Sequence, residues 1–352
     1  MRLLGIESSC DETAAAVVEN GERLLSNVVA SSMDLHVKYG GVVPEIAARS
    51  HIEVVLPVIR QALADAGCAW DDIDAIAVTY GAGLGGSLLI GVLTARTLAI
   101  VHDKPLYAIN HVLAHVYANF LTSTSLPSLQ MRTTQPSFPM LAIIVSGGHS
   151  QLALFEDHFQ YRLLGQTQDD AIGEAFDKVA KILGLPYPGG PSISKAAESG
   201  DPHKYHLPKA KVGKYDFSFS GLKTAVLRLA QAEIGEDYAF PSSQLSERLS
   251  EAQKHDIAAS FQQIAIETIV DKARRAYDEF APASVVIAGG VAASSELRSQ
   301  LTDALPLDIE YPDFKLCTDN GAMIATLGCF HVKTRQANAD AYSLVINPNL
   351  SM

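Results

Sequence analysis

The stretch Leu3-Leu4-Gly5-Ile6-Glu7-Ser8-Ser9-Cys10-Asp11-Glu12-Thr13 decides the fold, because its pattern returns about 140 residues later. The first copy is an apolar strand, a polar turn and a second strand from Ala14 to Val18. The second copy has an apolar strand at 141–145, the turn Ser146-Gly147-Gly148-His149-Ser150 and a strand at 151–155. Two strands joined by such a turn present backbone N–H groups and hydroxyls to an anion, so each turn predicts a phosphate loop.

A strand, a glycine-rich turn and a helix follow in both halves. Their ranges are 75–78, 81–87 and 88–100 in the first half, and 284–288, 289–295 and 296–304 in the second. In this unit the backbone can approach a nucleotide, and the start of the helix can face a phosphate. Long helices at 44–66 and 256–280 fill the intervals. Strands that alternate with helices in two related halves predict an α/β fold with a cleft between the halves.

Length and composition agree with two domains. The chain has 352 residues, of which 48% are hydrophobic and 19% are charged, as is typical of a folded two-domain protein. We expect domains at 1–121 and 140–334. The segment 122–139, rich in Ser, Thr, Pro and Gln, predicts a flexible connection, and 335–352 forms a C-terminal tail.

Charge and cysteine content narrow the functional classes. The net charge of −12 argues against a generic nucleic-acid binder, because phosphate contacts require clustered Lys and Arg. No apolar segment approaches the roughly 20 residues of a membrane span, and early acidic residues interrupt any signal-peptide pattern. The four cysteines form no C-x-x-C pair, so we expect a cytoplasmic protein without membrane contact.

One stretch is locally basic. Five lysines after His203, ending at Lys223, alternate with aromatic residues. Such a stretch can follow an RNA backbone and stack on splayed bases. It can equally be a solvated loop that leads into a strand.

His111 and His115 indicate a metal site, because positions i and i+4 share one face of a helix. Zinc peptidases of the H-E-x-x-H type carry a base beside the first histidine, but this chain has Val112 there. We therefore expect a metal that positions a substrate rather than one that drives peptide hydrolysis. The alternative is a satisfied histidine pair on a partly buried helix. Asp319 is the best third ligand, although it could be only the N-cap of the helix predicted at 322–330.

Seven motifs, in order over nearly the whole chain, resemble one family. They are Ile6-Glu-Ser-Ser-Cys-Asp-Glu-Thr13, His111-x-x-x-His115, Val145-Ser-Gly-Gly-His149, Gly173-Glu-Ala-Phe-Asp-Lys178, Tyr187-Pro-Gly-Gly-Pro191, Phe217-Ser-Phe-Ser-Gly-Leu-Lys223 and Gly289-Gly-Val291. This set is similar to the TsaD family of tRNA N6-adenosine threonylcarbamoyltransferases.

The resemblance implies a duplicated actin-like, sugar-kinase-like (ASKHA, RNase H-like) fold with a central cleft. It implies transfer of a threonylcarbamoyl group from threonylcarbamoyl-AMP to the N6 amine of adenosine 37 in tRNAs that read ANN codons, which forms t6A. It further implies that His111, His115 and Asp319 bind Fe(2+) or Zn(2+), and that a TsaB-like paralogue and a TsaE-like ATPase are partners. The residues implied to hold the adenylate are Ile144, Val145, Ser146, Gly147, Gly148, Asp177 and Gly190.

Three positions add detail to this expectation, and two other activities stay open. Asp11 and Glu12 are the acids expected to help the amine lose its proton, although Glu12 could instead brace the turn. Ser294 stands where the family commonly has Asn, so its contact with the adenylate would differ. The alternatives are an ATP-dependent small-molecule kinase of the same fold, in which the histidines would have no purpose, and a metallopeptidase, which lacks the base.

Overall fold

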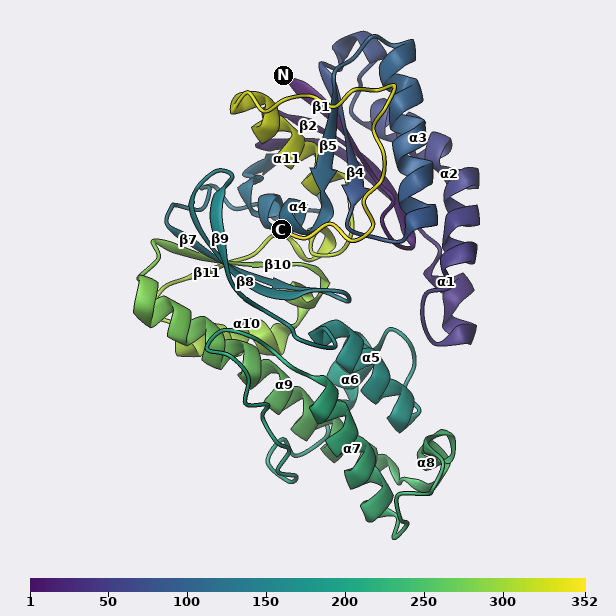
Figure 1. Cartoon of the computed structure of the whole chain (residues 1–352), viewed down its shortest axis with the longest axis vertical. Helices are drawn as coiled ribbons and strands as arrows, with labels where there is room; N and C mark the ends of the chain where they lie inside the picture. Colours follow the sequence, from purple (N-terminus) through teal and green to yellow (C-terminus); the bar gives the residue numbers. More distant parts are fainter. The chain divides into compact units, whose positions relative to one another are not determined.

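The computed structural model describes all 352 residues and contains eleven strands and eleven α-helices (Figure 1). The strands are β1 (Arg2–Glu7), β2 (Glu12–Glu19), β3 (Arg23–Ser31), β4 (Ala75–Gly81), β5 (Leu106–Asn110), β6 (Ser123–Thr124), β7 (Met140–Val145), β8 (Ser150–Asp157), β9 (Gln160–Gln166), β10 (Ser284–Ala288) and β11 (Ile309–Glu310). The helices are α1 (Met33–His36), α2 (Pro44–Asp65), α3 (Gly85–Val101), α4 (His111–Tyr117), α5 (Ile172–Leu183), α6 (Gly189–Ala197), α7 (Ser220–Glu233), α8 (Leu245–Arg248), α9 (Glu251–Phe280), α10 (Ser295–Ala304) and α11 (Gly321–Lys333). A short 3₁₀ segment, η5 (Gly290–Ala293), precedes α10.

Two mixed sheets repeat one topology. The first has the order β5-β4-β1-β2-β3-β6 and the second the order β11-β10-β7-β8-β9. In each sheet, three strands that are consecutive in sequence pair antiparallel, and the first of them also pairs parallel with a later strand. A second parallel strand, β5 or β11, completes the correspondence. The predicted duplicated α/β fold is confirmed.

The chain divides into two units, Met1–Pro136 with Tyr311–Met352, and Ser137–Glu310. The first unit holds the first sheet, and the second unit holds the second sheet. This division differs from the predicted halves at the C-terminal end, because α11 packs against β1, β2 and β4 of the first sheet. The segment 122–139, predicted to be a flexible connection, contains β6, which pairs with β3. No helix is both long and apolar enough to cross a membrane.

Helices cover both faces of strand β1. Leu4 and Ile6 belong to an apolar core that includes residues of α2 and α3. On the opposite face, Gly5 lies so close to α11 that a Cβ there would collide with the backbone of Gly321 and Ala325. This alternation follows from the two-residue period of a strand.

Two glycines of α11 face the sheet in the same way. A Cβ on Gly321 would lie 2.5 Å from the backbone of Ala15, and one on Gly328 would lie 2.6 Å from the Cβ of Ala77. Helix α11 therefore packs on the sheet at backbone distance, which only small residues at these positions permit.

The C-terminal tail covers the first glycine turn, residues 81–87. Arg96 on α3 donates hydrogen bonds to the carbonyls of Ala341 and Leu344, at 2.7 and 3.2 Å. The Gly83 N–H donates to the carbonyl of Pro348 at 3.1 Å. The prediction that a nucleotide approaches this turn is therefore wrong, because the chain's own tail occupies the space.

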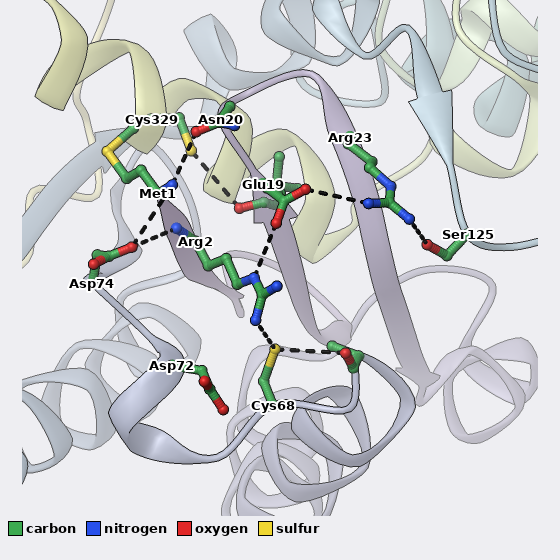
Figure 2. Close-up of polar contacts among 12 residues, drawn as sticks. Met1, Arg2, Glu19, Asn20, Arg23, Cys68, Asp72, Asp74, Ser125 and Cys329 are labelled. Carbon is green, nitrogen blue, oxygen red and sulfur yellow. Dashed lines mark hydrogen bonds and ion pairs between the residues drawn. The ribbon is translucent and has the colours of Figure 1, made fainter.

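A polar network ties the strands together at the other end of the first sheet (Figure 2). Arg2 donates from Nε to a carboxylate oxygen of Glu19 at 3.1 Å, and its backbone N–H donates to Asp74 at 2.7 Å. Arg23 donates to the second oxygen of Glu19 at 3.3 Å. The hydrogen bond from Arg2 helps to hold the pKa of Glu19 below its usual value. Because Arg2 begins β1, this network lies at the opposite end of that strand from Glu7.

We predict that Gly5→Ala lowers the free energy of unfolding of the first unit by about 1–3 kcal/mol, since the added methyl group must push α11 off the sheet. The single tryptophan, Trp70, lies in this unit, so its fluorescence in urea measures the effect. Gly221→Ala in α7 is the control, because a Cβ there meets nothing within 4 Å. Equal urea midpoints for Gly5→Ala and the unchanged protein would contradict the packing argument.

Candidate metal centre and nucleotide loops

His111 and His115 lie on α4, directly after strand β5. Asn110 caps the helix, since its side-chain oxygen accepts a hydrogen bond from the Leu113 N–H at 3.1 Å. The histidines are buried, with 8% and 3% of their surface exposed, and their ring centroids are 4.7 Å apart. The prediction that both lie on one face of a helix is confirmed.

Asp319 completes a group of three possible ligands. Its Oδ1 lies 3.6 Å from His111 Nε2 and 3.3 Å from His115 Nε2, and the three side chains could hold a metal ion. Asn320, not Asp319, caps α11, because its side-chain oxygen accepts from the Met323 N–H at 3.0 Å. The alternative that Asp319 is only a helix cap is therefore wrong.

The chemistry of this group fits a divalent metal. Both ring nitrogens of His115 are buried and make no hydrogen bond, although such nitrogens normally find a partner. Two imidazoles and a carboxylate are a donor set that suits Fe(2+) or Zn(2+). A metal at this place would use a nitrogen that the protein leaves unsatisfied.

Glu7 is the buried carboxylate behind His111, and the sequence analysis missed it. It has no exposed surface, and its Oε2 lies 3.2 Å from His111 Nδ1. Glu7 ends β1 and His111 follows β5, while β4 pairs parallel with both strands. Because the carboxyl ends of parallel neighbours meet at one edge of a sheet, this order of strands is the signal that could have found Glu7.

The charges of neighbouring groups shift the pKa values of His111 and Glu7. Burial lowers the pKa of His111, but the carboxylates of Asp319 and Glu7 outweigh burial and raise it to about 9. Burial raises the pKa of Glu7, but the charge of His111 outweighs that effect and lowers it. Glu7 Oε2 and His111 Nδ1 lie within ion-pair distance of each other.

Asp11 and Glu12, the predicted acids, lie in the turn between β1 and β2 and at the start of β2. Burial, together with the carboxylates of Asp319 and Asp11, raises the pKa of Glu12 to about 9. Glu12 is then protonated at neutral pH when no metal neutralises Asp319. Its Oε1 accepts a hydrogen bond from the Ser31 hydroxyl at 3.3 Å, which agrees with a role in bracing the turn.

Two further buried histidines hold the backbone of this turn, and the sequence analysis did not single them out. His51 Nε2 lies 2.9 Å from the carbonyl of Cys10. His36 Nε2 lies 3.2 Å from the Ser32 hydroxyl, which donates to the carbonyl of Asp11 at 2.9 Å. Burial lowers the pKa of His51, so this ring stays neutral. These contacts brace the backbone of the turn at Cys10 and Asp11.

In the second unit, the turn after β7 is built on Ser146. The Ser146 N–H donates to the carbonyl of His149 at 2.8 Å, and the Ser146 Oγ accepts from the His149 N–H at 3.1 Å. A Cβ built on Gly147 or Gly148 would meet nothing within 4 Å, so the backbone is open there. The side chains of the predicted residues Ile144 and Val145 are fully buried in β7, which leaves only their backbone for a ligand.

Two glycines bring other segments against the Ser146 turn. The Gly173 N–H, at the start of α5, donates to the carbonyl of Ser146 at 3.2 Å. Gly289 has a φ of +90°, and a Cβ there would lie 2.5 Å from the carbonyl oxygen of Val145. The starts of α5 and η5 therefore meet the same turn.

The remaining predicted contacts also lie in the second unit. Asp177 accepts a hydrogen bond from the Gly189 N–H at 2.7 Å, and burial raises its pKa. Gly190 is open, since a Cβ there would meet nothing within 4 Å. Ser294 caps α10 by accepting from the Leu297 N–H at 3.3 Å. Its hydroxyl thus already has a structural role.

The basic stretch after His203 is a loop packed on α9. Three of its lysines pair with acidic residues of that helix, namely Lys204 with Asp256, Lys209 with Glu267 and Asp271, and Lys214 with Glu279. Phe217 and Phe219 have no exposed surface. The interpretation that these aromatic rings stack on RNA bases is therefore wrong, and the solvated-loop alternative is nearer to the structure.

Comparison with known proteins identifies the family that the chain resembles. Residues 23–326 match the model of the TsaD family, tRNA N6-adenosine threonylcarbamoyltransferase. The chain is 49% identical to the enzyme of that name from Thermomicrobium roseum over 348 residues, which cover 97% of this chain and 94% of the relative. It is 45% identical to the Dehalococcoides mccartyi enzyme of the same name over 353 residues, which cover 100% and 99%.

A solved structure supports the fold. Full-length HypF in its phosphate- and nucleotide-bound form superposes with a TM-score of 0.56 at 12% identity, over 96% of this chain and 47% of HypF. This likeness extends to the fold alone. The family match over most of the chain, together with identity to relatives over nearly their whole length, shows that the chain belongs to the TsaD family of tRNA N6-adenosine threonylcarbamoyltransferases.

Proposed function

We propose that this chain transfers the threonylcarbamoyl group from threonylcarbamoyl-AMP to the N6 amine of adenosine 37 in tRNAs that read ANN codons. The observation that carries the proposal is the near-full-length identity to relatives named for threonylcarbamoyl transfer to tRNA adenosine. No observation favours the small-molecule kinase, and the metallopeptidase still lacks a base, because position 112 is a buried valine. The reaction takes place in the cytoplasm, where tRNA is used.

The chemistry explains why both units carry functional residues. An exocyclic adenine amine is a weak nucleophile, because its lone pair is delocalised into the ring. Transfer therefore needs an activated acyl donor and fixed groups that stabilise charge on the carbonyl oxygen and the departing phosphate. We assign the phosphate of the adenylate to the open backbone at Gly147 and Gly148, and the ribose hydroxyls to Asp177.

We assign the metal to His111, His115 and Asp319 as its protein ligands. When bound, Fe(2+) or Zn(2+) would polarise the carbamoyl carbonyl and orient the threonyl moiety. The protein supplies a site that is almost closed to solvent, since both histidines are buried and Asp319 is 19% exposed. Such a site strengthens electrostatic interactions with the donor.

We assign proton transfer to the turn that carries Asp11 and Glu12. Attack by N6 develops positive charge on nitrogen, which a nearby carboxylate can stabilise. We assign this role to Asp11 and Glu12, which lie in the turn between β1 and β2 and at the start of β2. Glu12 also holds the turn through Ser31.

The substrate tRNA requires help to bind. A net charge of −12 repels a polyanion, and the basic loop is already paired with α9. We therefore propose that a TsaB-like paralogue and a TsaE-like ATPase assemble with this chain and that partners supply part of the tRNA surface.

We predict that the purified chain, with both partner proteins and threonylcarbamoyl-AMP, converts adenosine 37 to t6A in an ANN-reading tRNA. Mass spectrometry of digested nucleosides measures the product. A transcript with guanosine at position 37 is the matched control and should remain unmodified. Lack of t6A under conditions in which the Thermomicrobium roseum relative forms it would refute the function.

We also predict that His111→Ala, His115→Ala and Asp319→Asn each lose stoichiometric metal and transfer activity while the first unit stays folded. A preformed site binds metal without being needed for folding, and Asn320 still caps α11 in all three variants. Metal content by mass spectrometry and Trp70 fluorescence in urea report the two properties. The control is His206→Ala, an exposed histidine of the second unit. Full metal occupancy in the three site variants would disprove the assignment.

A further inference from the structure

We infer that Glu7 is a positioning residue for the metal centre, whose carboxylate holds His111 with the proton on Nδ1 and leaves Nε2 for the metal. This inference rests on the proposed assignment of a metal to His111, His115 and Asp319. Glu7 itself is not a ligand in this arrangement, because its Oε2 contacts the far side of the imidazole, at Nδ1.

The carboxylate is fixed from three directions. Its Oε1 accepts a hydrogen bond from the Ser9 backbone N–H, and its Oε2 accepts one from the Thr79 hydroxyl. His111 Nδ1 lies 3.2 Å from the same Oε2. The three partners come from the turn after β1, from β4 and from α4, so three separate segments hold the Glu7 carboxylate.

The position of the proton follows from what each atom can do. A neutral imidazole has one donor and one acceptor nitrogen, and an ionised carboxylate only accepts. An unprotonated Nδ1 at this distance would place two lone pairs against each other. Nδ1 must therefore donate to Glu7, and Nε2, on the side of Asp319, carries the lone pair when the ring is neutral.

Ser9 offers the competing arrangement. Its hydroxyl oxygen lies 3.1 Å from the same Nδ1, and a hydroxyl can either donate or accept. If Ser9 donated to Nδ1, the proton would sit on Nε2 and oppose metal binding. Glu7 decides between these two states, because its oxygen cannot donate to Nδ1 while it is ionised.

The effect is confined to one of the two histidines. His115 Nδ1 has no hydrogen-bond partner, so no carboxylate orients that ligand in the way that Glu7 orients His111. Carboxylates behind a metal-binding histidine typically change metal affinity 10- to 100-fold when removed, because they fix the tautomer and make the nitrogen more basic. A loss of this size is the measurable consequence here.

Glu7→Gln tests the inference, because it keeps the shape and removes the charge. With its oxygen toward the Ser9 N–H, the new amide points its NH₂ group at His111 Nδ1 and favours the wrong tautomer. Zinc affinity of the metal-free variant, measured by competition with a coloured chelator, should fall about 10- to 100-fold. Histidine-labelled, zinc-loaded wild-type protein should show the His111 proton on Nδ1 in long-range ¹H–¹⁵N spectra.

Two matched variants separate positioning from bracing. Thr79→Val removes a hydrogen bond to the same carboxylate oxygen without touching His111, and Ser9→Ala removes the competing hydroxyl. Ser9→Ala should retain wild-type zinc affinity. Thr79→Val should lose less affinity than Glu7→Gln, because the carboxylate keeps its charge and its hydrogen bond from the Ser9 N–H. Trp70 fluorescence in urea confirms that each variant is folded. A tenfold loss in Ser9→Ala, or an equal loss in Thr79→Val and Glu7→Gln, would overturn the inference.

The remaining outcomes distinguish this inference from the assignment on which it rests. If His111→Ala loses zinc while Glu7→Gln binds it as tightly as the wild type, the metal centre stands and the role of Glu7 is refuted. Coordination of His111 through Nδ1 refutes it as well. If His111→Ala binds zinc like the wild type, the metal assignment fails and the inference falls with it.

Discussion

The close packing of α11 on the first sheet is the constraint on which the candidate metal centre depends. Gly5, Gly321 and Gly328 allow backbone to meet backbone, where any side chain would separate the two layers. This approach places Asp319, two residues before α11, beside the histidines that follow β5. A site made from residues about 200 positions apart is thus fixed by contacts that carry no chemistry of their own.

Around that site the protein concentrates negative charge that it only partly compensates. Glu7 is paired with His111. Burial and the nearby carboxylates raise the pKa of Glu12 to about 9, which favours its protonated form. Buried charge of this kind costs stability, and it is typical of functional sites, where groups serve a ligand rather than the fold. The orphaned nitrogens of His115 fit the same pattern. The second unit differs, since its Ser146 turn offers backbone rather than charged side chains.

The sequence predicted most elements because their periodicity is strong, as the agreement of 44–66 with α2 and of 284–288 with β10 illustrates. It also predicted the pair of histidines, since their spacing is local. It failed where long-range packing decides. Glu7 went unnoticed because only the strand order brings it to His111. The lysines after His203 looked available for RNA because the acids that neutralise them lie about 60 residues away, on α9.

The tail over residues 81–87 makes the two halves unequal in a way that the shared topology hides. Both halves have a strand, a glycine turn and a helix, but the first turn already has a ligand, which is the chain itself. Because that ligand is covalently attached, its effective concentration near the turn is about millimolar or higher. A free nucleotide could bind this turn only by displacing the tail at that effective concentration. Duplication thus supplied two similar turns, and the chain's own tail covers the first of them.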